Sequence, residues 1–508
     1  MLHYISIGCK VNQAEMAVLR HSVASEQRRM AEIKELDSLS RSLLSSRFRG
    51  NDKRSGNNNV RVCVLNTCAV TATAEAKSRK LIRRFIRENP DSRLIVTGCL
   101  AQAKPEEVRK IIRKGDMVVG NKEKGGIAEM VLQLKNLRTE ERKNHSETNR
   151  GSSSLVLESF SHSVCAERRT RAFVKIQDGC NNFCSYCIVP FLRSEMWSKP
   201  LNTVDKEIRE LVDKGYKEVV LTGINLGKHD NLVGLLKRLL KIDGLKRLRL
   251  SSIELEDVSA GLIDLMVGAP LAVAQDKRAG VNPAPTTVGN PAICPHLHIP
   301  LQSGSDRILK LMKRHYSSGD FIERINLLKR WIENPAITTD IIVGFPGETD
   351  ADFQQTLTVC KEVGFSKIHI FPFSPREGTN AFGMTDKVKA DIIKNRFNLL
   401  NNLARELSLR YKHLFLGKLV DVLVEDNKEG FTPHTNALVW GFTDRYIKVG
   451  IKPGGKPKPN QIVKVKITGI KPDYVTGIAT NPLTPRLRRA GTPRPQGRGS
   501  PPSGAARH

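Results

Sequence analysis

Three cysteines fall within eight positions of the segment DGCNNFCSYCIVP, residues 178–190, as Cys180, Cys184 and Cys187. The segment contains no fourth cysteine and no histidine. A structural zinc ion normally takes four protein ligands, whereas a four-iron cluster held by three thiolates leaves one iron open for another molecule. The spacing therefore favours an iron–sulfur cluster with an open iron. The alternative is a zinc site that takes its fourth ligand from elsewhere in the chain.

Three more cysteines, Cys9, Cys68 and Cys99, each follow a short apolar, β-branched segment. These segments, HYISIGC, VRVCVLNTC and RLIVTGC, are typical of buried strands, and helical patterns such as AEAKSRKLIRRFIREN separate them. The alternation predicts a parallel α/β sheet. Because parallel strands end at one edge, the three thiols can meet there. The alternative is that they are small core residues, as we interpret Cys63 within the second strand.

A second alternating region begins at Ala172 and predicts the elements that position the first cysteine segment. Its apolar segments read as six strands separated by mostly helical patterns: AFVKIQDG, EVVLTGI, RLRLSSI, HLHIPLQ, TTDIIVGF and KIHIFPF. This number of alternating strands and helices predicts a parallel β/α barrel or part-barrel, whose chemistry gathers at the carboxyl ends of the strands. Residues 178–190 follow the first of these strands, so we expect them at that rim.

Length and charge limit the class of protein. A chain of 508 residues is expected to form several domains, and a formal net charge of +30 favours a polyanionic partner such as nucleic acid. The last 28 residues hold six arginines and no acidic residue, so we expect a disordered basic tail that inflates this charge. No apolar run is long enough for a membrane span and no secretory signal is evident. We therefore expect a cytoplasmic protein.

The C-terminal part predicts a small all-β domain. The segments KLVDVLVED, ALVWGFTDRYIKVGI and QIVKVKITGI, after a helix at about 386–413, have the length and composition of short strands. In an RNA-binding domain Lys418, Arg445 and Lys448 would pair with phosphates, and Tyr446 would stack on a base. The alternative for each basic residue is a solvated surface.

The C-x3-C-x2-C spacing, with Tyr186 before its last cysteine, resembles the radical S-adenosylmethionine (radical SAM) enzymes. In these enzymes the open iron binds the amino and carboxylate groups of S-adenosyl-L-methionine (SAM), and an electron from the cluster cleaves SAM to a 5′-deoxyadenosyl radical. The resemblance implies SAM contacts in segments that follow the later strands. The implied residues are Tyr186, Gly223, Asn225, Ser252, Gln302 and Gly344. Ordinary turn chemistry is the alternative for each glycine and serine.

The N-terminal segments IGCKVNQ, LNTCAVT and VTGCLAQ extend the resemblance to the methylthiotransferase branch of that superfamily. This branch combines an N-terminal cluster domain, a radical SAM domain and a C-terminal TRAM domain. The likeness implies two [4Fe-4S] clusters, the second held by Cys9, Cys68 and Cys99 with an open iron on which the transferred sulfur is assembled. It also implies tRNA as substrate and an electron donor such as flavodoxin or ferredoxin. The sulfur source stays open.

Within this branch, GCKVNQ and LNTCAVT followed by KSR resemble the enzymes that convert N6-threonylcarbamoyladenosine, next to the tRNA anticodon at position 37, to its 2-methylthio derivative. The isopentenyladenosine enzymes more often begin with a GCQMN-type segment, and they are the first alternative. A non-catalytic RNA-binding protein that contains zinc is the more distant one.

These patterns together predict how the chain divides. The predicted parts, in order, are an N-terminal cluster domain at 1–136 with an inserted loop at about 25–59, a linker at 137–170, a radical SAM domain at 171–410 with an insertion at about 268–290, a TRAM domain at 411–480, and the tail at 481–508.

Overall fold

The computed structural model describes residues 2–6, 11–16, 61–131, 170–268, 292–426, 438–452 and 457–480. The first sheet has four parallel strands in the order β1-β2-β3-β4. They are β1 (Leu2–Ser6), β2 (Arg61–Thr67), β3 (Ser92–Gly98) and β4 (Met117–Val119). The three strands predicted here are confirmed, and β4 is an addition that the sequence patterns did not indicate.

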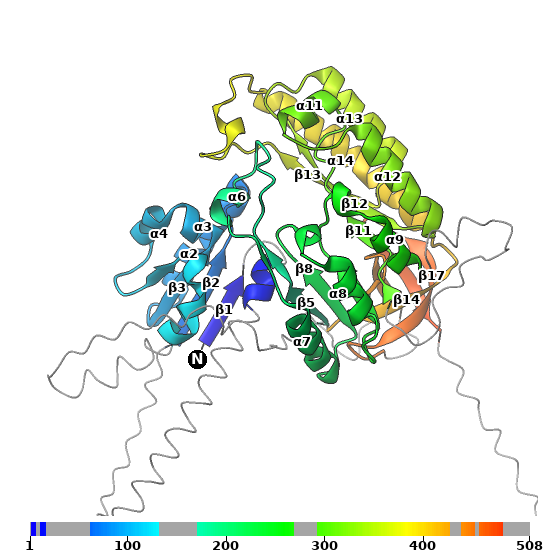
Figure 1. The fold of residues 1–508 in the computed structure, drawn as a ribbon, viewed down its shortest axis with the longest axis horizontal. Coiled ribbons are helices and arrows are strands. Elements are labelled where there is room, and N and C mark those ends of the chain that lie inside the picture. Colours follow the sequence, from blue (N-terminus) through cyan, green and yellow to red (C-terminus); the bar gives the residue numbers. More distant parts are fainter. Residues whose placement is uncertain are drawn as a thin grey trace, which may run out of the picture.

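Helix α2 (Ala72–Glu88) covers this sheet because one face of it is apolar. The Thr71 side chain caps its first turn by accepting a hydrogen bond from the backbone of Ala74. Ile82 and Phe85 point into a cluster that includes the buried thiol of Cys63, so Cys63 is a core residue as expected. Two short helices, α3 (Cys99–Ala103) and α4 (Pro105–Ile111), follow β3 (Figure 1).

The second region is an open, parallel part-barrel. One sheet has the order β10-β9-β8-β5 and the next has β11-β12-β13, and a parallel bridge between Ser252 and His298 connects the two. The strands are β5 (Arg171–Lys175), β8 (Glu218–Thr222), β9 (Arg247–Leu250), β10 (Ala292–Ile293), β11 (His296–His298), β12 (Ala336–Val343) and β13 (Lys367–Pro372). All six predicted strands are present, which confirms the α/β part-barrel.

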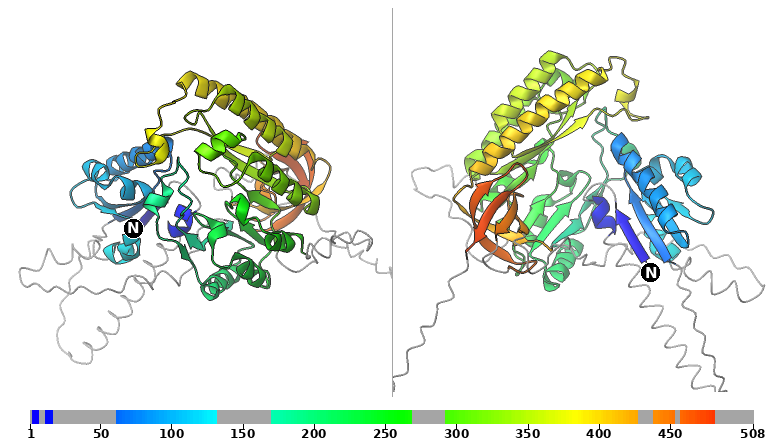
Figure 2. Two further views of the ribbon diagram at one scale, coloured as in Figure 1. Left: turned by 45° about the horizontal axis from the view of Figure 1, so that its top comes forward. Right: turned by 180° about the vertical axis from the view of Figure 1, so that it is seen from behind.

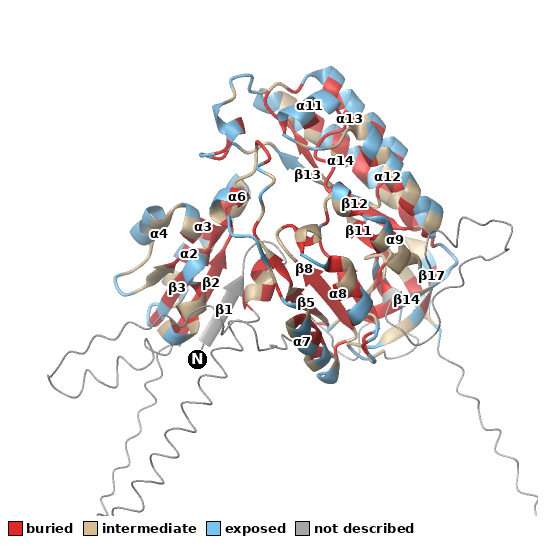
Figure 3. Cartoon of the chain, viewed as in Figure 1, coloured by how far each residue is buried: buried red, intermediate tan, exposed pale blue. Residues whose placement is uncertain are grey.

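Helices cover the outer face of the part-barrel, as two further views show (Figure 2). They are α7 (Leu201–Asp213), α8 (Leu232–Leu239), α9 (Ala260–Val267), α11 (Asp306–Leu311), α12 (Ser318–Trp331), α13 (Asp350–Val363) and α14 (Ala390–His413). Most of the strands between them are buried, although β13 is partly exposed, whereas the outer helix faces are exposed (Figure 3). One continuous apolar core therefore holds the strands and fixes the positions of their ends.

The C-terminal strands close into a small barrel in the order β14-β15-β16-β18-β17. They are β14 (Leu419–Val424), β15 (Val439–Thr443), β16 (Lys448–Lys452), β17 (Ile462–Ile470) and β18 (Val475–Ala479). The predicted all-β region is confirmed, and the barrel is consistent with a TRAM domain.

Several predictions concern residues outside the described part of the chain. Cys9, the inserted loop at 25–59, nearly all of the linker at 137–170 and of the insertion at 268–290, and the tail at 481–508 lie there. Within the described residues, no helix combines the length and apolar composition needed to cross a membrane.

Buried arginines join the small β-barrel to the amino ends of the part-barrel strands. Arg249 is fully buried, its Nε lies 2.8 Å from Glu218 Oε1, and its Nη1 donates to the carbonyl of Asp444 at 2.7 Å. Arg247 donates to the carbonyls of Asp421 and Phe442. Glu218 thus neutralises Arg247 and Arg249, and the same two guanidinium groups donate hydrogen bonds to backbone carbonyls of the small β-barrel.

We expect the Glu218 carboxylate to contribute to the stability of the folded chain through its pairs with Arg247 and Arg249. Replacing Glu218 by Gln leaves buried arginines without a counter-charge, and we expect the free energy of unfolding to fall by about 3 kcal/mol. Burial raises the pKa of Glu218, but Arg249 and Arg247 outweigh burial and hold that pKa below its ordinary value. The stabilisation is therefore present above the unfolded-state pKa and is lost as the pH falls through the folded-state pKa.

Urea unfolding at neutral and acidic pH measures both effects. Asp421→Asn is the matched control, because its exposed pair with Lys464 contributes at most about 1 kcal/mol. Equal losses for the two variants would contradict a stabilising role for the buried pair.

Candidate functional site at the strand ends

Cys68 and Cys99 lie at the carboxyl ends of two neighbouring strands. Thr67 at the end of β2 pairs in register with Gly98 at the end of β3, and each cysteine is the next residue. The Thr67 hydroxyl donates to the carbonyl of Thr97 at 2.6 Å, and both thiols are buried. The structure therefore brings together two members of the predicted N-terminal trio, while Cys9 lies outside the described residues.

Gly98 allows the two strand ends to approach closely. Its φ is +98°, and a Cβ built on it would lie 2.3 Å from the carbonyl oxygen of Thr67. A side chain at this position would strain the backbone and push the two strand ends apart. Glycine is therefore required at position 98 of the VTGC segment, because only glycine lets the strand ends before Cys68 and Cys99 lie this close together.

Cys180, Cys184 and Cys187 lie on the cysteine loop (residues 178–190), at the carboxyl edge of the part-barrel as predicted. Cys184 is buried and the other two are partly exposed. Across the part of the chain that the model describes, no three His, Cys, Asp or Glu side chains are grouped tightly enough to hold a metal ion. The predicted trio lies on one loop, and its role as a cluster-binding trio stays a prediction.

The thiols of this loop are nevertheless close enough to affect one another. Burial, together with charge on Cys184 and Cys180, raises the pKa of the Cys187 thiol to about 12, against an opposing hydrogen bond from the backbone of Val189. Burial likewise raises the pKa of Cys180. Three soft sulfur donors on one short loop fit an iron–sulfur cluster, which must displace their protons when it binds.

Arg314 and Glu254 are site residues that the sequence patterns did not single out individually. Arg314 Nη1 lies 3.3 Å from the Cys184 sulfur, and its guanidinium forms an ion pair with Glu254, which follows β9. Its Nε donates to the Tyr316 hydroxyl at 3.1 Å. Glu254 lies two residues after Ser252, which the resemblance implies as a SAM contact, whereas no motif or spacing marks Arg314.

The five later residues implied as SAM contacts all lie along the same carboxyl edge. Gly223 and Asn225 follow β8, Ser252 follows β9, Gln302 forms a bridge with Ile341 of β12, and Gly344 follows β12.

Contacts distinguish these residues from one another. Asn225 Nδ2 lies 3.9 Å from the Cys180 sulfur, which places it at the cysteine loop. A Cβ on Gly344 would lie 2.3 Å from Ile393 Cγ1, so close packing of α14 already requires that glycine. Tyr186 packs beside an apolar cluster that contains Phe345. Contact of these residues with SAM stays a prediction.

Two sets of buried ion pairs join the N-terminal sheet to the part-barrel, besides the exposed Lys122–Glu195 pair and the hydrogen bond from Asn121 to the Leu192 carbonyl. A buried ion cluster of Glu15, Lys124, Lys175, Asp178 and Arg193 forms one of them. At the other, Arg376 after β13 pairs with Glu75 of α2, and the Ala72 backbone donates to the Ser374 hydroxyl at 3.1 Å. The two edges that carry cysteines are therefore held in fixed relation to each other (Figure 1).

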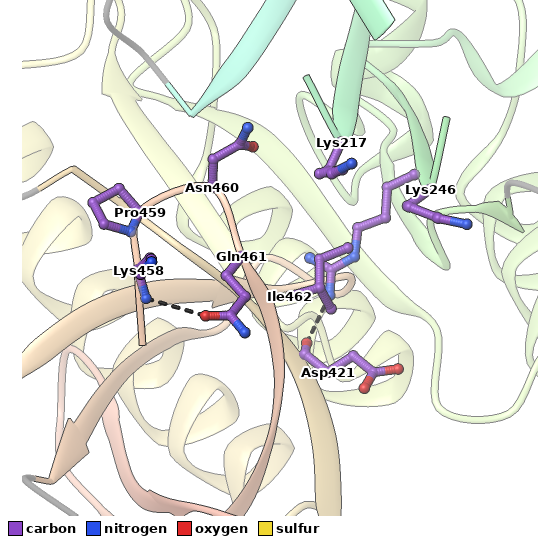
Figure 4. A pocket seen from close by; sticks show the side chains of 9 residues that line it. Lys217, Lys246, Asp421, Lys458, Pro459, Asn460, Gln461 and Ile462 are labelled. Carbon is purple, nitrogen blue, oxygen red and sulfur yellow. Dashed lines mark hydrogen bonds between the residues drawn. The ribbon is translucent and has the colours of Figure 1, made fainter. Parts of the chain in front are cut away.

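A basic hollow lies at the other end of the part-barrel. Lys217 and Lys246, which directly precede β8 and β9, line it together with Lys458, Asn460 and Gln461 of the small β-barrel (Figure 4). Because it lies at the amino ends of these strands, this hollow is separate from the edge that carries the cysteines.

Two residues expected to contact RNA have other partners. Arg445 donates to the carbonyls of Glu333 and Asn334, and the Tyr446 ring lies 4.1 Å from the guanidinium of Arg249. These contacts join the small β-barrel to the part-barrel, and contact of Arg445 and Tyr446 with RNA stays a prediction. Lys418 and Lys448 remain exposed.

Family models match the two regions that carry the cysteines. Residues 174–277 and 288–360 match the Radical SAM superfamily, and residues 35–120 match a family described as Uncharacterized protein family UPF0004. Radical SAM methyltransferase TsrM from Kitasatospora setae has a similar structure, at a TM-score of 0.46 and 14% identity over 75% of this chain and 77% of that one. A similarity of that degree adds no argument about the site.

Curated relatives give the narrower family. The chain is 38% identical to threonylcarbamoyladenosine tRNA methylthiotransferase MtaB of Bacillus subtilis, over 82% of this chain and 88% of that protein. The Thermotoga maritima protein of the same name is 40% identical over 71% and 77%. A tRNA-2-methylthio-N(6)-dimethylallyladenosine synthase of Clostridium botulinum is 32% identical over 82% and 88%.

The chain therefore belongs to the radical SAM methylthiotransferase family of enzymes, and this membership implies SAM and a [4Fe-4S] cluster as cofactors.

The requirement for glycine at position 98 is directly testable. Gly98→Ala should lower the free energy of unfolding by more than about 1 kcal/mol and reduce the iron bound per chain, because it displaces the residues before Cys68 and Cys99. Gly383→Ala is the control, since a Cβ there meets no atom within 4 Å. Chemical denaturation and iron analysis after anaerobic purification measure both quantities. Unchanged iron content in Gly98→Ala would contradict this role.

Proposed function

We propose that this enzyme converts N6-threonylcarbamoyladenosine at position 37 of tRNA, next to the anticodon, to its 2-methylthio derivative. The observation that carries this choice is the identity of 38% and 40% to relatives named for threonylcarbamoyladenosine, against 32% and 34% to two relatives named for dimethylallyladenosine. Identity to the relatives named for dimethylallyladenosine is lower but still above 30%, so N6-isopentenyladenosine is the second candidate substrate.

We infer that the chain holds two [4Fe-4S] clusters. Cys180, Cys184 and Cys187 would hold one at the part-barrel edge, and Cys9, Cys68 and Cys99 would hold the other at the end of the N-terminal sheet. When bound, the clusters and SAM supply the radical, sulfur and methyl chemistry that substitution of an unactivated adenine C–H bond requires. The strand-end position of five of these cysteines supports this arrangement.

The residues around the cysteine loop would orient these groups. Arg314 donates a hydrogen bond toward the Cys184 sulfur and forms an ion pair with Glu254. The two side chains would therefore hold the Cys184 thiolate in place and line one side of the SAM site. Asn225 acts in the same way at Cys180. Tyr186, Gly223, Ser252, Gln302 and Gly344 complete the proposed SAM-binding edge.

We propose tRNA as the macromolecular partner and the exposed Lys418 and Lys448 as phosphate contacts on the small β-barrel. A flavodoxin or ferredoxin would supply electrons, and the cytoplasm is the proposed location. The proposed division of the chain is the one predicted from the sequence, with a cluster domain at 1–136, a radical SAM domain at 171–410 and a TRAM domain at 411–480.

Nucleoside mass spectrometry tests the substrate. tRNA from cells that lack the gene should lose 2-methylthio-N6-threonylcarbamoyladenosine and accumulate its unmodified precursor, while 2-methylthio-isopentenyladenosine stays constant. Restoring the gene should reverse the change. If the isopentenyl derivative disappears instead, the second candidate substrate is correct.

Cys184→Ala tests the proposed role of the part-barrel thiols. The anaerobically purified parent should carry about eight irons per chain, and the variant about half as many. SAM cleavage should be abolished while tRNA binding persists, because the small β-barrel is untouched. Cys360→Ala is the control, since Cys360 is a buried core thiol of α13. A colourless parent that contains zinc would support the RNA-binding alternative.

A further inference from the structure

The basic hollow between the part-barrel and the small β-barrel is a cavity of about 750 Å³ with a cationic lining. Three lysines from separate parts of the sequence line it: Lys217, Lys246 and Lys458. The first two lie on the part-barrel side, and Lys458 lies across the hollow on the small β-barrel (Figure 4). A ligand held by all three would therefore contact both parts of the chain.

The charges of these lysines have no described counter-charge. The lining contains one acidic residue, Asp421, whose carboxylate lies 3.2 Å from the ammonium group of Lys464 and whose backbone carbonyl accepts from Arg247. Arg247 itself pairs with Glu218. Among the described residues, the three lysine side chains form no ion pair, so the hollow presents three positive charges to an incoming anion.

Backbone hydrogen bonds hold these like charges together. The amides of Lys246 and Arg247 both donate to the carbonyl of Lys217, each at 3.0 Å. Across the hollow, the Asn460 side chain donates to the carbonyl of Gly215 at 2.6 Å and so joins the small β-barrel to the part-barrel. Like charges that the backbone keeps close repel one another, and an anion between them would remove that repulsion.

The remaining groups of the lining indicate which anion fits. Compact nucleotide sites hold phosphates with free backbone N–H groups, but here the amides of Asn460 and Gln461 donate to the carbonyls of Val424 and Lys458. The lining contains no aromatic ring on which a base could stack. Flexible ammonium groups alone suit the phosphates of a nucleic-acid backbone, which they contact without reading bases.

The position of the hollow separates it from the reacting nucleotide. Lys217 directly precedes β8 and Gly223 directly follows it, and six steps along a strand span about 20 Å. A ligand in the hollow is thus at the opposite end of the part-barrel from the cysteine loop. A long RNA can reach both places, whereas a single nucleotide cannot.

We propose that the basic hollow binds backbone phosphates of the substrate tRNA, at nucleotides other than the one that is modified. Lys217, Lys246 and Lys458 supply the contacts, so one stretch of RNA backbone is held by the part-barrel and the small β-barrel together. This inference rests on tRNA as the proposed partner and adds a second place of contact to Lys418 and Lys448.

The salt dependence of tRNA binding tests this proposal. The probe is tRNA from cells that lack the gene, and the protein is the anaerobically purified full chain. Replacing Lys217, Lys246 and Lys458 together by Gln should weaken binding by about tenfold or more and lower the slope of log Kd against log salt concentration by about 2, because three phosphate contacts are lost. Iron content and SAM cleavage without tRNA should stay at the parent values.

A matched control removes the same net charge elsewhere. Lys206, Lys237 and Lys361 are exposed on α7, α8 and α13 and form no described ion pair, so their joint replacement by Gln should leave affinity and slope near the parent values. Replacing the three lysines of the hollow by Arg keeps the charge and should retain binding. If the triple Gln variant fails to fold, the variant with only the exposed Lys246 and Lys458 replaced decides, with about two thirds of the slope change.

The outcomes separate this inference from the proposed function. Equal losses in the hollow variant and the control variant would show an effect of net charge alone and overturn the proposal. A parent chain that binds ATP or pyrophosphate through these lysines, while the triple Gln variant binds tRNA as the parent does, would make the hollow a nucleotide site and also overturn it. A parent that binds no tRNA at all contradicts the proposed partner itself.

Discussion

The site depends on the buried contact between Glu15 and Arg193. Glu15 precedes the strands of the N-terminal sheet that bear Cys68 and Cys99, whereas Arg193 lies just after the cysteine loop of the part-barrel. The exposed Lys122–Glu195 pair and the hydrogen bond from Asn121 to the Leu192 carbonyl also join the two cysteine regions, and a second buried ion pair connects Glu75 with Arg376. Because both ion pairs are buried, loss of one partner would leave a charge that neither water nor salt can easily screen.

A radical reaction places a strict demand on such a junction. In the proposed reaction, the group that removes the hydrogen and the group that delivers sulfur must both reach the same carbon of one adenine base, so their supports must hold their relative positions to within a fraction of a bond length. Strand ends embedded in an apolar core meet this demand better than surface loops do. The register between Thr67 and Gly98 sets one support, and the part-barrel core beneath the cysteine loop sets the other.

The small β-barrel is held by a different kind of contact. Arg247, Arg249 and Arg445 donate mainly to backbone carbonyls across the junction, and Tyr446 covers one guanidinium with its ring. The junction thus uses residue types that are typical of RNA recognition. This is why the sequence pattern GFTDRYIKVGI suggested a base-stacking tyrosine, although the structure uses that ring between two parts of the same chain.

The sequence alone determined most of the strands, the parallel α/β class and the strand-end places of Cys68, Cys99 and the cysteine loop, because hydrophobic periodicity and the alternation of strands with helices can be read along the chain; the short β4 was missed. The tertiary structure alone decided which charged side chains meet. Glu15, Arg193 and Arg314 carry no periodic signal, and their partners lie up to 178 positions away in the sequence. Their roles arise from burial and long-range packing, which bring such groups together only when the whole core has formed.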